Sequence, residues 1–277
     1  MEPQKRNATV WIVVAVIVVL LCCAAVAVAA AAGWLVTTWA RETTDTEQQR
    51  AVVTGSIVLE VHNNVGNMTV EPGPDGEVVV NATKKVRGSN QAERERLLAD
   101  TEVTVAQQDG RVIVTVKQPV RLLSGRSVSV DLDIRVPHNT GLQIEGNVGD
   151  VEARSLTGEL QVRSGVGDVT LTDITVQGQL EVRLDVGDIR FHGILPSAGK
   201  LTFKSNVGKV RLELPTDASF SLDAKTDVGS IDCQFDVSDQ RSGEKLVGDE
   251  LQGTVGAAPQ ATLSIQVNTG DISIRTW

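Results

Sequence analysis

A Val-Gly pair recurs along the second half of this sequence at nearly constant spacing, and it limits the possible folds more than any other feature. Its glycines are 18, 20, 21 and 21 residues apart, at Gly149, Gly167, Gly187, Gly208 and Gly229. A repeat of about 20 residues is typical of proteins built by stacking similar short units. Two outlying glycines in similar surroundings, Gly66 and Gly270, are expected to be the first and last members of the stack.

The residues around each of these glycines alternate between apolar and polar. Around Gly167, for example, Leu160 and Val162 precede the glycine, and Val169 and Leu171 follow it. Apolar residues at every second position share one face of a β-strand, and glycine allows the positive φ of a sharp bend. We therefore predict an all-β fold, a β-solenoid whose stacked repeats of about 20 residues enclose a narrow aliphatic core.

Two further positions complete the predicted unit. The residue before the glycine is expected to point inward as a plug at the bend, and it is valine at Val148, Val166, Val186, Val207 and Val228. A short return turn, such as residues 176–178, should carry the chain to the next unit. The seven glycines of the bends are therefore assigned as structural turn positions.

The position after the glycine decides whether the repeat carries chemistry. In chain order it is Asn67, Asp150, Asp168, Asp188, Lys209, Ser230 and Asp271. A catalytic row or a metal ladder would need the same chemistry in every unit, whereas a solvent-facing turn accepts all of these residues. Calcium-binding solenoids also use a nonapeptide, a period about half as long as this one. We interpret the aspartates as turn residues and expect no catalytic residue, no metal site and no cofactor.

The segment before the repeats predicts strands and one short helix. Alternating residues flank Asp109-Gly110, a dipeptide suited to a tight hairpin because both positions tolerate positive φ. Upstream of this hairpin, Asn90 followed by Glu93 is typical of a capping box. A single helix is therefore expected just after Asn90.

An uncharged, apolar segment precedes all of these elements. Residues 10–36 contain no charged side chain and could cross a bilayer core of about 30 Å as a helix. Lys5 and Arg6 lie before this segment and place the N-terminus in the cytoplasm. A cleaved signal peptide is the alternative, although its apolar region is usually only about 7–15 residues long. The predicted organisation is a cytoplasmic tail at 1–9, a transmembrane anchor at 10–36, a polar stalk at 37–54 and an extracytoplasmic β-solenoid at 55–277.

Charge and composition argue against several functions. The 277-residue chain has a formal net charge of −9, which would repel nucleic acid. It has no tyrosine, four phenylalanines and four tryptophans, so few rings are available to stack on sugars or bases. A polysaccharide-active enzyme is a minor alternative, because Asp168 and Asp188 would lie about 5 Å apart in adjacent units, near the separation used by retaining glycosidases. Stacking alone accounts for that separation, and we expect the protein not to be an enzyme.

The clearest surface feature lies four residues before the glycines. Cations occupy this position in four units, with Glu145 before them and Gln266 after them: Arg163, Arg183, Lys204 and Lys225. If the units stack in register, these side chains form a column with about 4.8 Å between neighbours. Like charges at that distance repel. The column therefore predicts either a bound polyanion or neutralisation by nearby carboxylates such as Glu181 and Asp185.

Several stretches together resemble a known family. They are the recurrent G-D-[VI]-x-[LIV] copies, the lead-in AERERLLADTEVTVAQQDGRVIV, the strand DIRVP and the single N-terminal anchor. They resemble the bacterial putative-adhesin domain family of unknown function, over about residues 55–277. The toast-rack-like β-solenoids of this family are similar to the C-terminal domains of Lia-type and phage-shock envelope stress proteins. The resemblance implies the fold and carries over no catalytic residue.

The sequence therefore predicts a single-pass protein of the cell membrane whose solenoid is a binding, adhesion or scaffolding module at the cell envelope. Two alternatives stay open: an envelope-stress sensor or regulator, and an accessory subunit of a membrane protein complex. The expected partners are the membrane and either an envelope polymer or another membrane protein. A homo-oligomer is also possible, because an open solenoid end invites edge-to-edge association.

Overall fold

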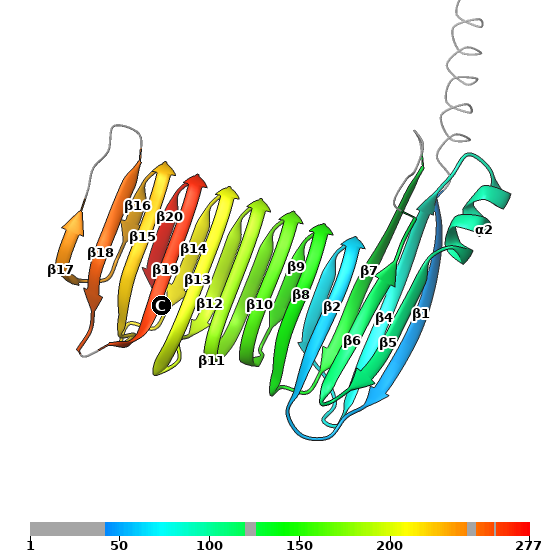
Figure 1. Ribbon diagram of the computed structural model, residues 1–277, viewed down its shortest axis with the longest axis horizontal. Coiled ribbons are helices and arrows are strands. Elements are labelled where there is room, and N and C mark those ends of the chain that lie inside the picture. Colours follow the sequence, from blue (N-terminus) through cyan, green and yellow to red (C-terminus); the bar gives the residue numbers. More distant parts are fainter. Residues whose placement is uncertain (1–41, 120–125, 243–247, 258) are drawn as a thin grey trace, which may run out of the picture.

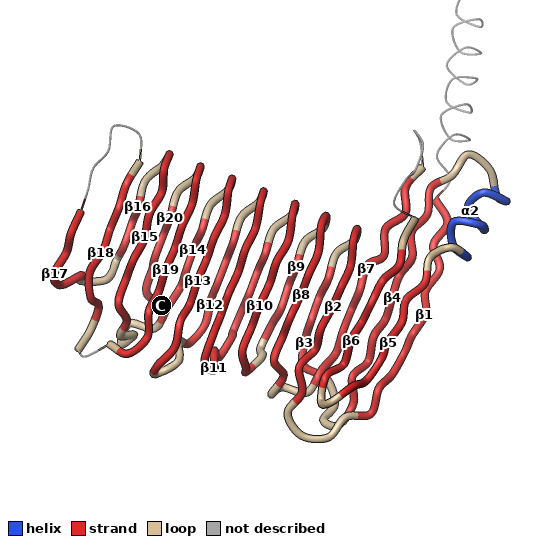
Figure 2. The backbone as a smooth tube through the Cα atoms, in the orientation of Figure 1, coloured by secondary structure: helices blue, strands red, loops and turns tan. Residues whose placement is uncertain are grey.

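The computed structural model describes residues 42–119, 126–242, 248–257 and 259–277, and these form twenty strands and one helix (Figures 1 and 2). The predicted all-β fold with one short helix is confirmed. The tail and the anchor expected at 1–9 and 10–36 fall outside the described residues. No helix within the described part is long and apolar enough to cross a membrane.

The strands form two long faces, which lie back to back like the two sides of a rack (Figure 1). The first face contains, in spatial order, β6 (Arg111–Lys117), β2 (Ile57–Val65), β8 (Thr140–Val148), β10 (Thr157–Val166), the second half of β11 (Val169–Val186), β13 (Ala198–Val207), β19 (Gln260–Thr269), β15 (Phe220–Val228), β18 (Asp249–Val255) and β17 (Val237–Ser242). The second face contains β7 (Ser127–Val136), β3 (Met68–Pro72), β9 (Val151–Arg154), the first half of β11, β12 (Ile189–Ile194), β14 (Val210–Leu214), β20 (Ile272–Thr276) and β16 (Ile231–Cys233). From β2 to β15 and from β7 to β16 the neighbouring strands are parallel, as expected for a solenoid.

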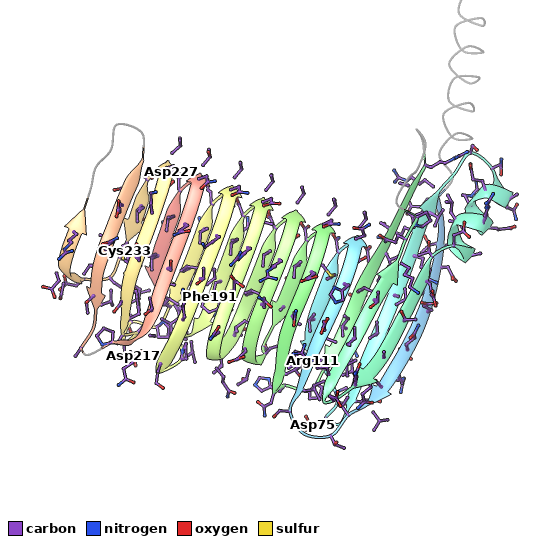
Figure 3. The ribbon with its side chains drawn as sticks, in the orientation of Figure 1. Asp75, Arg111, Phe191, Asp217, Asp227 and Cys233 are labelled. Carbon is purple, nitrogen blue, oxygen red and sulfur yellow. The ribbon has the colours of Figure 1, made fainter. Side chains whose placement is uncertain are left out.

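One aliphatic core fills the space between the faces. Leu160, Val162, Val169 and Leu171, the residues that predicted strand alternation, are 0–2% exposed. Figure 3 labels Phe191, whose ring lies 5.6 Å from that of Phe203 across the core. Each coil contributes a few such side chains, so burial accumulates by stacking.

The stacking order differs from the chain order at the C-terminal end. The repeat of Gly270 is expected to be last, but β19 lies between β13 and β15, and β20 lies between β14 and β16. The coil of Gly229 is therefore the terminal one, and the expected position of Gly270 is wrong. Every coil offers the same parallel edge, so the repeat pattern alone does not decide which coil pairs with which. Gly66 does occupy the first coil of the regular stack, beside Gly149.

The bend glycines allow the coils to approach each other closely. All seven have φ between 135° and 145°, a conformation that side chains resist. A Cβ atom on Gly187 would also lie only 2.1 Å from the carbonyl oxygen of Gly167 in the neighbouring coil. Both observations explain why glycine occupies these seven positions.

The valines before the bends do not plug the core, and that prediction is wrong. They are 44–49% exposed and line the edge of the rack: Val148, Val166, Val186, Val207 and Val228. Alternation would turn them inward, but the chain has already begun to bend at this point. The last inward position lies two residues earlier, where a polar side chain can bond a bend carbonyl. Thr226 Oγ1, for example, donates to the carbonyl oxygen of Gly270 at 2.8 Å.

The edge opposite the bends also differs from the prediction, because the chain makes no separate return turn there. The sequence predicts a return turn between separate strands at residues 176–178. Instead β11 continues through them for 18 residues and serves both faces. The chain changes direction within this strand at Gly178, where φ is 82°.

The N-terminal end closes the rack with an antiparallel layer. β4 (Glu77–Arg87) pairs with β7 on one side and with β1 (Glu42–Val52) on the other, and β5 (Glu102–Gln108) pairs with β6. The polar stalk expected at 37–54 is therefore wrong for 42–52. This strand shows no apolar periodicity because it is held mainly by backbone pairing and by exposed ion pairs, such as Arg87 to Glu42 at 2.9 Å.

Two local predictions for this end are confirmed. In helix α2 (Gln91–Ala99), the backbone N–H of Glu93 donates to Asn90 Oδ1 at 2.9 Å, as a capping residue requires, whereas the carboxylate of Glu93 accepts from the N–H of Ser89 at 2.8 Å and not from Asn90 as in a complete capping box. In the β5–β6 hairpin, Asp109 and Gly110 both have positive φ, 49° and 76°.

Replacing one bend glycine should destabilise the whole domain. We expect Gly187→Ala to lower the free energy of unfolding by about 3 kcal/mol or more, since it combines backbone strain with a clash against the next coil. Gly110→Ala is the matched control, because Gly110 has positive φ but a Cβ atom there would meet nothing within 4 Å; it should cost only about 1 kcal/mol. Thermal unfolding of the full chain compares the two, and equal losses would contradict the close-stacking account.

Candidate functional site

A ladder of side-chain to backbone hydrogen bonds runs along the bends, at the position after each glycine. Each bond joins an Asp or Asn Oδ1 to the backbone N–H of the equivalent residue one coil away. The bonds are, acceptor first, Asn67 to Asp150 (3.0 Å), Asp150 to Asp168 (2.8 Å), Asp168 to Asp188 (2.9 Å), Asp188 to Lys209 (2.9 Å) and Asp271 to Ser230 (3.2 Å). The repeated aspartate is thus a connector between coils.

The ladder also explains the exceptions in the pattern. Asn67 supplies the same acceptor as aspartate, whereas a lysine has none. Lys209 Nζ instead pairs with Asp271 Oδ2 at 3.2 Å. No group of three or more His, Cys, Asp or Glu residues suited to a metal ion occurs in the part of the chain that the structure describes.

The predicted cation column exists, but its order differs from the expectation. Arg163 pairs in register with Arg183, and Arg183 with Lys204. Gln266 then lies between Lys204 and Lys225, because β19 is inserted between their strands. The four cations therefore form a group of three and a separate lysine.

Carboxylates neutralise much of this column. Arg163 lies 3.3 Å from Glu181 and 3.8 Å from Glu145, and Arg183 lies 2.5 Å from Glu181. Lys225 pairs with Asp227 at 3.3 Å. Lys204 makes no ion pair with any described residue.

The shared carboxylate of Glu181 is held in its charged form. The amide of Gln161, which donates to it at 2.8 Å, lowers the pKa of Glu181, and the guanidiniums of Arg183 and Arg163 lower it further. Glu181 thus fixes both arginine side chains on the same part of the first face. They remain 44% and 52% exposed, for Arg163 and Arg183 respectively.

A trough of about 700 Å³ crosses the first face beside the bends and contains both arginines. It runs across β2, β8, β10 and β11 and reaches the end of β6. Its outward-facing lining residues form two rows, His62, Glu145, Arg163 and Arg183 in the first and Asn64, Asn147, Gly165 and Asp185 in the second.

Gly165 keeps the trough open in the second row. Its neighbours in this row carry side chains that bond from coil to coil, as Asn147 does with Asn64. A Cβ atom on Gly165 would lie 2.6 Å from the carbonyl oxygen of Asn147, so a side chain does not fit there. Because Gly165 has no side chain, its backbone lines the trough directly beside Arg163.

The end of β6 completes the trough, and sequence reasoning did not include it. Lys117 and Gln118 line its first end, and Gln118 bonds both the N–H and the carbonyl oxygen of Val65, at 3.0 and 2.8 Å. Lys117 lies far from the repeats in sequence, and no periodic signal connects it with them. Only the parallel pairing of β6 with β2 brings it beside the column.

His62 is a further lining residue that the sequence did not assign to a site. Its Nε2 lies 2.8 Å from Glu60 Oε1, and its Nδ1 lies 3.3 Å from Glu145 Oε2. The bond to His62, followed by that to Arg111, lowers the pKa of Glu60. His62 therefore bridges two carboxylates at the edge of the trough. Arg163 lies in the same row, two strands away, with Glu145 between them.

One protein family and several solved structures are similar to this chain. The family described as Toastrack DUF4097 matches residues 53–275. A protein from Clostridium sporogenes ATCC 15579, described as a putative cell adhesion protein, is a similar solved structure at 13% identity, with a TM-score of 0.44, over 84% of this chain and 100% of that one. A putative adhesin from Bacteroides fragilis NCTC 9343 is similar at 16% identity, with a TM-score of 0.40, over 83% of this chain and 97% of that one. No curated protein matches the chain.

The aspartate ladder should make stability depend on pH. The backbone N–H of Asp188, and then Arg190, lower the pKa of Asp168. A lowered pKa in the folded state means that folding favours the carboxylate. This stabilisation is present above the unfolded-state pKa of about 3.9 and is lost as the pH falls through the lower folded-state pKa.

We therefore expect Asp168→Asn to reduce the loss of stability between about pH 5 and pH 2, because asparagine keeps the Oδ1 acceptor without titrating. Asp168→Ala should instead cost about 1 kcal/mol at neutral pH, the value of a lost hydrogen bond. Denaturant unfolding at several pH values measures both effects. If Asp168→Asn retained the full acid dependence, the assignment of the ladder would be wrong.

Proposed function

This chain belongs to the Toastrack DUF4097 family, and we propose that it is a membrane-anchored, non-catalytic binding module. Its trough binds an acidic polymer of the cell envelope. The resemblance stated from the sequence is confirmed by the family match over residues 53–275. The polymer and the anchor are the parts that experiment must test.

The observation that carries the proposal is the parallel placement of Arg163 and Arg183. They stand in register on adjacent strands within a trough that runs across the strands. Neighbouring strands are about 4.8 Å apart, so a linear polymer lying in the trough would meet a guanidinium group in each of two successive coils. Lys117 adds a third cation at one end.

The existing ion pairs leave these arginines available. Exposed ion pairs contribute only about 0–1 kcal/mol each, so an acidic group of a ligand could replace Glu145 or Glu181 at low cost. A guanidinium has five N–H donors and binds carboxylate or phosphate through two of them. Arg163 and Arg183 can therefore keep one contact with Glu181 and add a second to the polymer.

The arrangement gives no support to an enzyme. Asp168 and Asp188, the pair that resembled a glycosidase dyad, accept backbone N–H bonds and both pair with Arg190, at 2.9 and 3.1 Å. Their carboxylates are committed to the ladder.

The sequence supports the anchor. Residues 10–36 carry no charge, and β1 begins only a few residues later, at Glu42. The start of β1 lies on the same side of the molecule as the bends (Figure 1). We infer a single-pass protein with a cytoplasmic N-terminus, which holds the bend edge towards the membrane and leaves the first face accessible to envelope polymers.

Reversing the two charges of the trough should abolish this binding. We expect Arg163→Glu with Arg183→Glu to weaken binding of polygalacturonate or of short-chain polyphosphate to the detergent-solubilised full chain by about tenfold or more, because the change removes two exposed ion pairs of up to about 1 kcal/mol each and replaces them with repulsion. Affinity should fall with added salt. Comparison of the two polymers separates carboxylate from phosphate recognition.

Lys225→Glu is the matched control. Lys225 belongs to the same column but lies outside the trough, beyond Gln266. Binding should be unchanged in this variant. Equal losses in both variants would indicate a general effect of net charge, and binding of neither polymer to the unaltered chain would refute the proposal.

A further inference from the structure

The two faces of the rack do not end at the same place. Beyond β15 the first face continues with two antiparallel strands, β18 and β17. The second face ends at β16, a strand of three residues that pairs only with β20 within the described residues. The last coil is therefore covered on one face and open on the other (Figure 1).

The open end exposes side chains that every other coil buries. Ile231 and Cys233 occupy inward positions of the second face, and both are partly exposed. Their equivalents in the neighbouring coils are 0–2% exposed, namely Ile189, Val210 and Ile272 for Ile231, and Phe191, Leu212 and Ile274 for Cys233. Phe235 is also partly exposed, although its ring packs edge-on against Phe220 at 5.4 Å. Figure 3 shows Cys233 at this end of the molecule.

β16 also has a backbone edge without a partner strand. The N–H of Ile272 donates to the carbonyl oxygen of Ser230, and the N–H of Gln234 donates to that of Ile274, both at 2.9 Å. By the alternation of a strand, Asp232 faces β20, whereas Ile231 and Cys233 direct their backbone groups away from it. The N–H of Ile231 is bonded to Asp249 Oδ2 at 3.1 Å. The carbonyl of Ile231 and both backbone groups of Cys233 have no partner strand in the described part of the chain.

A groove of about 740 Å³ lies at this edge. Its apolar lining is formed by Ile231, Cys233, Phe235, Val237 and Leu251, and its acidic lining includes Asp236, Asp249 and Asp232, of which Asp232 also pairs with Arg275 at 3.6 Å. None of the described residues that line it is a lysine or an arginine. An occupant that fits must therefore be extended, apolar on the side that faces the core, and cationic on the other.

We propose that the open end of the second face binds an extended segment of a partner protein, which adds to β16 as a strand. Its sequence alternates apolar residues with lysine or arginine, so that one face covers Ile231 and Cys233 while the other lies beside Asp232. The acidic groove favours such a segment over a second copy of this chain, since a symmetric contact would place the same carboxylates against each other. This site is independent of the trough.

The test uses an eight-residue peptide that alternates lysine and valine, with the detergent-solubilised full chain. A peptide of the same composition, with its lysines in one block and its valines in another, is the control for charge. Binding is measured by fluorescence anisotropy, and occupancy of the groove is measured by the alkylation rate of Cys233, resolved from Cys22 and Cys23 by mass spectrometry. We expect the alternating peptide to bind at least tenfold more tightly than the block peptide and to slow alkylation of Cys233 at least fivefold.

Two matched pairs of variants locate the site. Asp236→Lys should weaken binding about tenfold, whereas Asp75→Lys, in an exposed loop between β3 and β4 away from the open end (Figure 3), should leave it unchanged. Cys233→Ala keeps the free backbone N–H and loses only part of one apolar contact, so it should weaken binding less than about threefold, whereas Cys233→Pro removes that N–H without touching the bonds to β20 and should not bind. Thermal unfolding confirms that each variant is folded.

Equal binding of the two peptides, or unchanged alkylation at saturation, would overturn the proposal. Equal effects of Asp236→Lys and Asp75→Lys would also overturn it, because they would indicate attraction by net charge alone. If the chain without peptide protected Cys233 as its concentration rose and formed dimers, the occupant would be a second copy, and the proposed partner segment would be wrong.

Discussion

The structure depends on the close approach of backbone at the bends. From Gly149 to Gly229 in the stack, the place where a Cβ atom would lie is 1.9–2.2 Å from a carbonyl oxygen of the preceding coil. Only glycine permits this contact, and the contact leaves little freedom in the distance or register between coils. Because each coil must repeat its neighbour in register, every position of the repeat becomes a straight row along the rack.

Some of these rows stabilise the fold, and others form its surface. The inward rows form the core, and the row after the glycines links the coils through side-chain to backbone bonds, as Asp168 does with Asp188. Only the outward rows of the faces are free to vary, and Arg163 and Arg183 belong to one of them. On the proposed function, recognition by this scaffold depends on a few charges placed at a fixed spacing, which a membrane anchor would leave accessible.

The repeat was sufficient to predict the coils because glycine spacing and strand alternation are both local. Non-local pairing was not predictable in the same way. The insertion of β19 between β13 and β15 was not predictable because the coils have identical edges. β1 was not predicted as a strand because its side chains are mostly exposed and backbone pairing holds it in place. The prediction that the valines before the bends point inward was wrong for a different reason, since strand alternation stops where the chain bends. In the same way the arginine column was visible in the sequence, whereas Lys117 and His62 joined it only through the pairing of β6 with β2 and of β2 with β8.

The central claim is that the trough on the first face binds an acidic polymer, and hydrogen–deuterium exchange with the full chain tests it most directly. With polygalacturonate or polyphosphate at saturation, the account predicts slower exchange in residues 116–118, 145–147 and 163–165 and at Arg183 and Asp185, which line the trough. Exchange at the second face and at 225–228 should not change. Protection confined to other residues, or no protection with either polymer, would contradict the account.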